Sequence, residues 1–426
     1  MKVFKIAVLL LILQQHATAQ AVNNGFDNTR LQRIDKFLEK EIKENHIPGA
    51  SVLLIKKGQV VYNKAFGYAD IESKRVMRTD DIFRIASQTK AVTSVAAMLL
   101  WEEGKFLLED PVSKYIPAFK SPKVLVSFNA QDSSYTTRPA KREITIRHLL
   151  THTSGLIYQI PYLGDPQLAS IYNKAGIPAL LGAPGTTVGE KMQELAKLPL
   201  LHDPGESFTY GLSTDLLGYL VEIWSGQTLE TFFRERIFRP LEMNDTWFNL
   251  PAEKAKRLIS VYQPLQNGQL EKAERVFDGG PGNYPAIQHT YLSGGGGLSS
   301  TTADYAKFLQ MLLHKGKYKG TQLLSPATVA MMLTNQLEEN THTSPYPAMP
   351  QDFQFGLGFA LETEKNDHLQ PLRKGSFSWE GAVATYYWVD PQEDLVALFY
   401  TQEFATPLWG YYQNIFRVLT YQALVD

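Results

Sequence analysis

Residues 83–104 read FRIASQTKAVTSVAAMLLWEEG, and this stretch predicts both a structural element and a chemistry. Apolar residues recur at helical spacing from Val92 to Leu100, and Gly104 ends the pattern. The spacing therefore predicts a helix over 89–103. Ser87 stands at the start of this helix, and Lys90 follows three residues later.

The Ser87–Lys90 pair is typical of nucleophilic catalysis. A serine hydroxyl is a weak nucleophile until a base takes its proton. Residues three apart share a helix face, so the Lys90 amine can reach the Ser87 hydroxyl. The helix N-terminus also favours negative charge that develops nearby. An ordinary helix cap is the alternative for any one serine, but Ser87 is the only serine in the chain with a lysine three positions on.

A second candidate is Tyr210, which begins the segment Tyr210-Gly211-Leu212-Ser213 ahead of a helix expected from about Thr214. A tyrosine on such a loop can act as a general base if its pKa falls from about 10 toward neutrality, at a cost of roughly 4 kcal/mol. An ammonium such as that of Lys90 lowers a tyrosine pKa. Packing at a loop edge is the alternative, since the chain has 21 tyrosines.

A third candidate is the segment Trp379-Glu380-Gly381-Ala382, which leads into a strand pattern from Thr385. Small residues at a strand edge let a substrate backbone approach and let an N–H point at an acyl oxygen. An ordinary edge strand with a glycine bulge is the alternative.

The order of the periodic segments predicts an α+β fold. Strand patterns lie at both ends of the chain, and helical patterns lie between them. The ends therefore complete one sheet, a sheet lobe from about 30–86 and 350–426, and a helical lobe from about 87–349 is inserted. The strands are expected over 50–56, 59–66, 355–361, 384–389 and 395–401, and the further helices over 144–150, 214–224, 229–238, 303–314 and 411–424.

Composition narrows the function. The 426 residues carry a net charge of −1, so no basic excess favours nucleic acid as a partner. The chain has no cysteine, which excludes a thiol nucleophile and thiolate metal sites. The glycines at 294–297 precede no Lys-Ser/Thr pair, so they do not match a phosphate-binding loop. His148 and His152 belong to no His-Glu-x-x-His motif, so they do not match that zinc site. We expect no metal or cofactor, and a small molecule as the partner.

The N-terminus has the features of a secretory signal peptide over residues 1–19. Two lysines precede the apolar run from Ile6 to Leu13, and Ala17-Thr18-Ala19 supplies small residues for cleavage after Ala19. A buried first helix or a membrane anchor is the alternative, but eight apolar residues cannot cross a bilayer. We expect a periplasmic or secreted protein, residues 20–426, without a membrane span.

Together the three candidate segments, in this order, resemble the serine β-lactamase and penicillin-binding-protein superfamily. The resemblance is nearest to class C β-lactamases and family VIII carboxylesterases and covers nearly the whole mature chain. Its supporting stretches are Phe83 to Ser87, Ile144 to Leu156, Phe238 to Met243 and Ser293 to Leu298.

The resemblance implies a role for each site residue. Ser87 would be the nucleophile, Lys90 its base or base partner, and Tyr210 the second proton-transfer group. The backbone N–H groups of Ser87 and Ala382 would form the oxyanion hole. The implied fold is a β-lactamase/transpeptidase-like antiparallel sheet flanked by helices, with the site in the cleft beside the helical lobe. The implied substrate-binding residues are Gln88, Leu212, Trp379, Glu380 and Gly381.

Two departures from the family pattern bear on the substrate. Leu212 stands where β-lactamases have the asparagine of Tyr-x-Asn, and Trp379-Glu380-Gly381 stands where they have Lys-Thr-Gly. The lysine would pair with the carboxylate of a β-lactam, and losing a charge-assisted hydrogen bond costs about 1.5–3 kcal/mol, or roughly tenfold to a hundredfold in affinity. Arg373 or Lys374 is a candidate replacement for the cation.

The sequence therefore predicts an exported, esterase-like serine hydrolase that works through an acyl-Ser87 intermediate. A β-lactamase, or a peptidase acting on D-amino-acid or cell-wall peptides, is the alternative on the same scaffold. A non-catalytic binding protein is the third hypothesis, although a binding protein has no need of Ser87, Lys90 and Tyr210 together.

Overall fold

The computed structural model describes residues 22–160, 163–182, 185–277, 279–339, 341–343, 353–366 and 370–425. The signal peptide expected over residues 1–19 lies outside these residues and stays a prediction. Within the described ranges, no helix combines the length and apolar character needed to cross a membrane.

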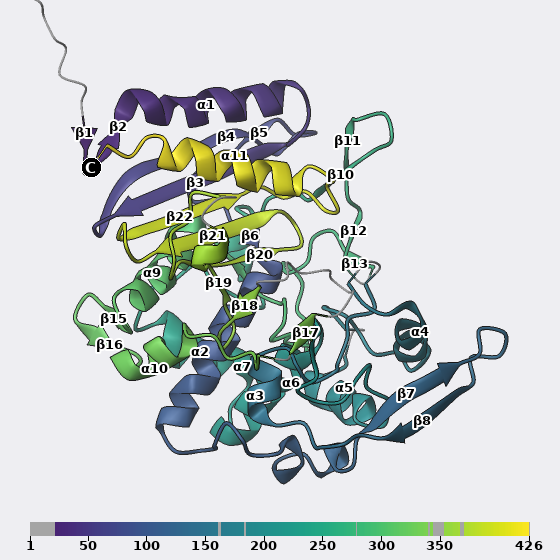
Figure 1. The fold of residues 1–426 in the computed structure, drawn as a ribbon. Helices are drawn as coiled ribbons and strands as arrows, with labels where there is room; N and C mark the ends of the chain where they lie inside the picture. Colours follow the sequence, from purple (N-terminus) through teal and green to yellow (C-terminus); the bar gives the residue numbers. More distant parts are fainter. Residues whose placement is uncertain are drawn as a thin grey trace, which may run out of the picture.

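The two ends of the described chain build one antiparallel sheet (Figure 1). Its strand order is β18-β19-β20-β21-β22-β3-β4-β5, and β22 pairs with β3 in register from Tyr400 opposite Ser51 to Leu395 opposite Lys56. The expected α+β fold with an antiparallel sheet is thus confirmed. The strands are β3 (Gly49–Lys56), β4 (Gln59–Asp70), β5 (Arg75–Val76), β18 (Gln354–Phe355), β19 (Ala360–Leu361), β20 (Phe377–Gly381), β21 (Thr385–Asp390) and β22 (Leu395–Tyr400).

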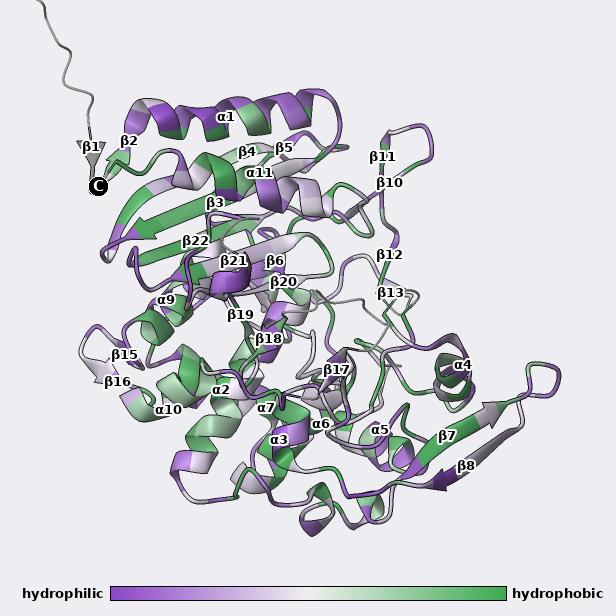
Figure 2. Ribbon diagram, in the orientation of Figure 1, coloured by the Kyte–Doolittle hydropathy of each residue, from purple (hydrophilic) through white to green (hydrophobic). Residues whose placement is uncertain are grey.

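Helices cover both faces of the sheet, which buries β3 along its whole length. Side chains alternate along a strand, so Val52 and Leu54 pack with the core under α1 (Asn28–Lys43) and α11 (Trp409–Tyr421). Leu53 and Ile55 join the opposite core, to which α2 (Thr89–Glu102) and α9 (Thr302–Leu313) contribute. Figure 2 shows β3 and β22 as hydrophobic and α1 as mostly hydrophilic. A strand covered on both faces reads as a continuous apolar run, as this one does.

A group of helices below the sheet packs around α6 (Ser213–Ser225). This helix contacts α2, α3, α5 and α7, and it is apolar enough to sit inside the group. A hairpin of β7 (Lys123–Phe128) and β8 (Tyr135–Pro139) extends from this part of the molecule (Figure 1). The other helices are α3 (Ile146–Leu150), α4 (Pro166–Lys174), α5 (Val188–Leu195), α7 (Leu229–Phe233), a π-helical turn over Arg234–Phe238, α8 (Ala252–Ala255) and α10 (Pro326–Met332).

Short two-stranded pairs and single turns connect these elements. The pairs are β1 (Val22–Asn23) with β2 (Phe26–Asp27), β6 (Phe83–Arg84) with β14 (Ser299–Ser300), β9 (Ser207–Phe208) with β17 (His342–Thr343), β10 (Tyr262–Pro264) with β11 (Leu270–Lys272), β12 (Arg275–Val276) with β13 (Gly280–Pro281), and β15 (Lys317–Tyr318) with β16 (Thr321–Gln322). The 3-10 turns are Ala86–Gln88, Val112–Lys114, Pro117–Phe119 and Glu364–Asn366.

Several expected elements form where the pattern placed them, and two differ. The strands expected over 50–56 and 59–66 form and pair across a turn at Lys57-Gly58, and the helix expected over 89–103 is confirmed. The strand expected over 355–361 is instead two short strands, because Gly358 takes a φ of 98° and reverses the chain between them. The helix expected over 229–238 is α-helical only to Phe233 and then widens into the π-helical turn. The lobe boundaries at residues 86 and 350 stay a prediction.

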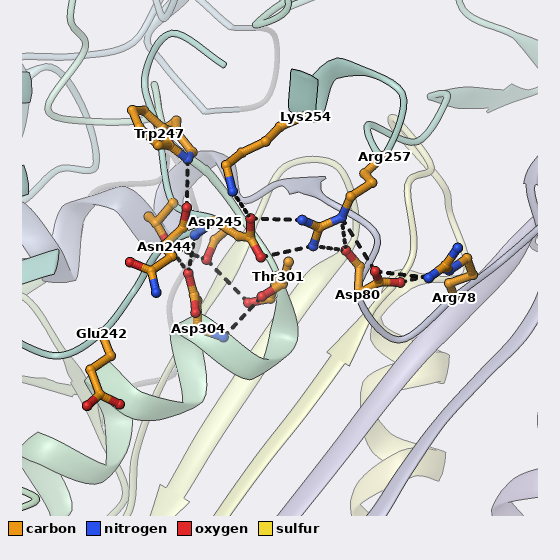
Figure 3. Close-up of polar contacts among 12 residues, drawn as sticks. Arg78, Asp80, Glu242, Asn244, Asp245, Trp247, Lys254, Arg257, Thr301 and Asp304 are labelled. Atoms are coloured by element: carbon orange, nitrogen blue, oxygen red, sulfur yellow. Dashed lines mark hydrogen bonds and ion pairs between the residues drawn. The ribbon is translucent and has the colours of Figure 1, made fainter. Parts of the chain in front are cut away.

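A polar network fixes the start of α9 to the loop that follows the π-helical turn (Figure 3). The Asp245 N–H donates to Asp304 Oδ2 at 2.6 Å. The Asp245 carboxylate accepts from Lys254 at 2.6 Å and from Arg257 at 2.8 Å. Arg257 also donates to the Asp80 carbonyl, at 2.8 Å from its Nε. The network thereby joins residues of the helical part to the segment that leads from β5 toward Ser87.

Candidate active site

Ser87 lies at the junction between the 3-10 turn Ala86–Gln88 and α2. Its side chain is half-buried, whereas both of its neighbours are fully buried, so its hydroxyl is accessible at the base of the site. Ala86 has a φ of 43°, in the left-handed region that disfavours residues with a Cβ. Such strain is held by surrounding structure and is common next to catalytic groups. Here the Ala86 methyl packs with Leu180 and Val383.

The Lys90 amine is buried and held by three oxygen atoms. Its Nζ lies 3.3 Å from Ser87 Oγ, 2.9 Å from the Tyr158 hydroxyl and 2.6 Å from the Gly295 carbonyl oxygen. Burial lowers the pKa of Lys90 to about 7, and the nearby Asp215 carboxylate opposes this shift. A lysine with this pKa is partly neutral near pH 7, so it can accept the Ser87 proton.

Tyr210 reaches the same hydroxyl from a distant segment. Its hydroxyl accepts the Trp379 indole N–H at 3.3 Å, and interaction with the Ser87 side chain lowers its pKa. Lys90 Nζ lies 4.6 Å from the centre of the Tyr210 ring. Burial raises the pKa of Tyr210, and the hydrogen bonds from Ser87 and Trp379 offset this only in part. The fall of this pKa toward neutrality, on which a general-base role of Tyr210 depends, is therefore not seen, because desolvation is the largest effect. These directions favour Lys90 over Tyr210 as the base expected for Ser87.

Three side chains that sequence reasoning missed, those of Tyr158, Asp215 and Ser293, complete the surroundings of Lys90. The Tyr158 hydroxyl accepts from Lys90 and lies 3.4 Å from Asp215 Oδ2. Asp215 Oδ1 in turn accepts from the Ser293 hydroxyl at 2.5 Å and from the Gly295 N–H at 3.3 Å. One feature of the sequence could have indicated this cluster: Asp215 is a carboxylate inside the apolar helix that follows Tyr210. A fully buried ionisable group requires polar partners.

Gly295 has a steric reason to be glycine. A Cβ at this position would lie 2.4 Å from Asp215 Oδ2 and 2.5 Å from the Tyr158 hydroxyl. The same residue supplies the carbonyl oxygen that accepts from the Lys90 amine.

The end of β20 lies against the backbone of Ile85, two residues before Ser87. A Cβ at Gly381 would lie 2.4 Å from the Ile85 carbonyl oxygen, so only glycine permits this approach of strand and loop. Ala382 follows directly and is exposed. Among the described residues, the backbone N–H groups of Ser87 and Ala382 donate to no backbone carbonyl. They are thus free to serve as oxyanion donors, the role expected for them.

Two expected substrate-binding residues do not face the cleft. Gln88 is fully buried, its carbonyl accepts from Tyr305, and its side-chain oxygen accepts from the Tyr400 hydroxyl. Gln88 therefore joins α2 to the sheet. Leu212 is also fully buried and packs in the core at the start of α6. Both predictions are corrected, because a family position transfers the residue but not the direction of its side chain.

Of the other expected residues, Trp379 lies against Tyr210, whereas Glu380, Arg373 and Lys374 have partners elsewhere. Trp379 is half-buried against Tyr210, with 5.4 Å between ring centres. Glu380 is exposed, and its Oε2 accepts the Trp409 indole N–H at 2.7 Å. Arg373 pairs with Glu393 and Lys374 with Glu364, so neither replaces the missing cation.

His148 and His152 both have structural partners. His148 Nδ1 accepts the Thr145 N–H in the capping box of α3. His152 is buried, and its ring lies 4.9 Å from the ring of Tyr210, against which it packs. Burial lowers the pKa of His152 well below its usual value, so it packs as a neutral ring.

Comparison with known proteins connects this geometry to a family. The Beta-lactamase family model matches residues 34–416. The chain is 30% identical to acyltransferase calJ of Penicillium decumbens over 84% of each chain. It is 30% identical to esterase EstB of Burkholderia gladioli over 66% of this chain and 69% of the esterase. The solved structure of EstCE1, a hydrolase with promiscuous acyltransferase activity, superposes with a TM-score of 0.76 and 26% identity, covering 92% of this chain and 99% of that one.

Proposed function

Because the chain belongs to the beta-lactamase family, whose members include serine hydrolases and acyltransferases, we propose that it hydrolyses neutral carboxylic esters through an acyl-Ser87 intermediate. The enzyme class rests on the family. The choice of ester over lactam or peptide rests on the residues around Ser87.

One observation carries the choice of substrate: the indole of Trp379 occupies the place beside Tyr210 that the family motif gives to a lysine. The N–H of that indole donates to Tyr210, and the next residue is the anionic Glu380. Arg373 and Lys374 are held by their own carboxylate partners. An anionic lactam therefore meets no compensating charge beside Trp379, whereas a neutral ester needs none.

The proposed reaction starts when neutral Lys90 takes the Ser87 proton across the 3.3 Å contact. Ser87 Oγ then attacks the ester carbonyl carbon, and the N–H groups of Ser87 and Ala382 stabilise the oxyanion. The bond to the alcohol oxygen breaks, and the leaving alkoxide takes a proton from the Lys90–Tyr210 pair. Water then attacks the acyl-Ser87 ester, gives up a proton to the same pair, and releases the acid.

Rates on three matched substrate classes test the proposal. We expect kcat/KM for a short-chain 4-nitrophenyl ester to exceed that for a chromogenic cephalosporin and for a D-alanyl-D-alanine peptide. A cephalosporin rate far above the ester rate would favour a β-lactamase, and a dominant peptide rate would favour a peptidase.

Trapping of the intermediate separates an enzyme from a binding protein. A fluorophosphonate probe should add one adduct mass to the wild-type protein and none to Ser87→Ala. A wild-type protein that gains no adduct mass, like Ser87→Ala, would support the non-catalytic binding protein.

Acyl transfer to a second alcohol is another candidate function. The observation that favours it is the similarity to calJ and to EstCE1, whose descriptions name acyltransferase activity. Both outcomes share the acyl-Ser87 intermediate and differ in whether water or an alcohol attacks it. Hydrolysis of the ester in the presence of 1-butanol, with butyl ester and free acid measured separately, distinguishes the two.

We propose in addition that the protein is exported and cleaved after Ala19. The support is the lysine-flanked apolar run and the small residues at 17–19. Expression of the full chain in a Gram-negative host should give a periplasmic protein whose N-terminal sequence starts at Gln20. A cytoplasmic protein that retains Met1 would contradict export.

A further inference from the structure

A cavity of about 730 Å³ opens beside the proposed oxyanion hole. Gly381 and Ala382 form part of its wall, and Ala382 supplies one of the two N–H groups proposed to bind the acyl oxygen. Phe277, Phe404 and Trp409 contribute aromatic side chains to the wall. A group of the substrate bonded close to the reacting carbonyl can therefore extend into this cavity.

The wall of the cavity contains a buried carboxylate without a full set of partners. Glu403 follows β22, is only 2% exposed, and lines the cavity. Its Oε2 has no hydrogen-bond partner among the described residues. Burial raises the pKa of Glu403 to about 7, which a hydrogen bond with the Thr406 side chain opposes only in part. A buried carboxylate without a compensating cation is costly, and a ligand that brings one removes that cost.

The rest of the lining has one sign of charge. Glu380 is the other ionisable side chain of the described lining, and it too is acidic. No lysine, arginine or histidine occurs among the described lining residues. Aromatic faces next to carboxylates are the surroundings that bind ammonium groups, because both attract positive charge.

We propose that the cavity between Glu403, Glu380 and Trp409 is a subsite for an ammonium group carried by the substrate. The inference rests on the proposed ester hydrolysis and names its substrate class: esters that bear a cation on the acyl chain or on the alcohol. Glu403 and Glu380 would determine specificity, and the chemistry would remain with Ser87 and Lys90.

Binding of two alcohols of the same shape tests the subsite without requiring turnover. Choline has a positively charged nitrogen at the position where 3,3-dimethylbutan-1-ol has a carbon. By calorimetry at pH 8, we expect the wild-type protein to bind choline tighter by about tenfold or more, the scale of a charge-assisted contact. In Glu403→Gln this preference should fall toward unity. Equal affinities of the wild type for the two alcohols would overturn the proposal.

A second variant keeps the test decisive if Glu403→Gln fails to fold. Glu380 is exposed, so Glu380→Gln removes a charge from the rim of the cavity without leaving a buried gap. It should weaken choline binding and leave 3,3-dimethylbutan-1-ol binding unchanged. Glu364→Gln is the matched control, because its carboxylate is exposed and pairs with Lys374 by a different cavity. A choline affinity that changes equally in both variants would also overturn the proposal.

Turnover of charged and neutral ester pairs then locates the cation. The alcohol-side pair is acetylthiocholine with S-3,3-dimethylbutyl thioacetate, and the acyl-side pair is 4-nitrophenyl 4-(trimethylammonio)butanoate with 4-nitrophenyl 5,5-dimethylhexanoate. The pair in which the charged ester has the larger kcat/KM identifies the side that enters the cavity. Charge-selective binding without turnover of any of the four esters would contradict the proposed esterase and retain the subsite. Turnover of all four esters without charge selectivity would support the proposed esterase and contradict the subsite.

Discussion

The chemistry of the site depends on how one amine is held. Lys90 contacts Ser87 Oγ, and burial brings its pKa to about 7. Since the neutral amine is the proposed base, kcat/KM for a neutral ester should rise as pH increases through about 7 and then level off. An activity that is independent of pH between 5 and 9 would contradict this role.

The Asp215 carboxylate sets the pH at which kcat/KM rises, which is the acid limb of the pH profile. It raises the pKa of Lys90 against the effect of burial, so Asp215→Asn should lower that pKa further and move the limb to lower pH. A pH profile of kcat/KM for both proteins measures the shift. Glu253→Gln, which neutralises an exposed carboxylate on α8, should leave the limb in place. A limb that stays in place or moves to higher pH in Asp215→Asn would contradict the assignment.

Trp379 is the residue that we expect to set ester against lactam preference. Trp379→Lys would restore a cation beside Tyr210 and remove the indole donor. The ratio of cephalosporin to ester kcat/KM should rise by about tenfold to a hundredfold, the value of one charge-assisted hydrogen bond. Trp379→Met removes the indole without adding charge and is the control. A ratio that rises equally in both variants would show that space, and not charge, limits the lactam.

At the scale of elements, the approach of β20 to the start of α2 determines the oxyanion geometry. In Gly381→Ala the new methyl would meet the Ile85 carbonyl oxygen at 2.4 Å, and backbone cannot give way as a flexible side chain does. We expect kcat to fall by about a hundredfold, the effect of removing one oxyanion donor.

Gly410→Ala is the matched control for this substitution. Gly410 lies in α11, and a Cβ there would meet nothing within 4 Å. It should retain kcat and gain about 0.4–1 kcal/mol of stability from the restricted unfolded chain. Equal kcat values for the two variants would contradict the tight contact at Gly381.

At the scale of the whole molecule, the network in Figure 3 connects parts that are distant in sequence. Asp245 is about one-fifth exposed and accepts from both Lys254 and Arg257. Asp245→Asn should lower the free energy of unfolding by about 1–3 kcal/mol, because it leaves two cations with weaker acceptors. Urea denaturation measures this loss.

Asp80→Asn changes the same network at its exposed end. The Asp80 side chain is 47% exposed, and Arg257 also bonds to the Asp80 backbone carbonyl, which the substitution keeps. The loss should stay below about 1 kcal/mol. A larger loss for Asp80→Asn than for Asp245→Asn would contradict this account of the network.

Local patterns predicted much of the fold because they act over few residues. The hairpin at Lys57-Gly58 and the helix from Thr89 follow from alternation, helical spacing and glycine stops. The strand expected over 355–361 failed because a glycine at positive φ reverses the chain inside an apolar run. Periodicity alone does not detect such a reversal.

The sequence by itself determined the α+β fold and the helical proximity of Ser87 and Lys90, since both depend on spacing along the chain. Only the tertiary structure decided what surrounds the amine. Tyr158 and Gly295 are 68 and 205 residues from Lys90 in the sequence, and both contact its Nζ. It also turned Gln88 inward, raised the pKa of Tyr210 by burial and placed Glu403 in the cavity wall. These outcomes depend on burial and on contacts between distant segments, neither of which a local pattern encodes.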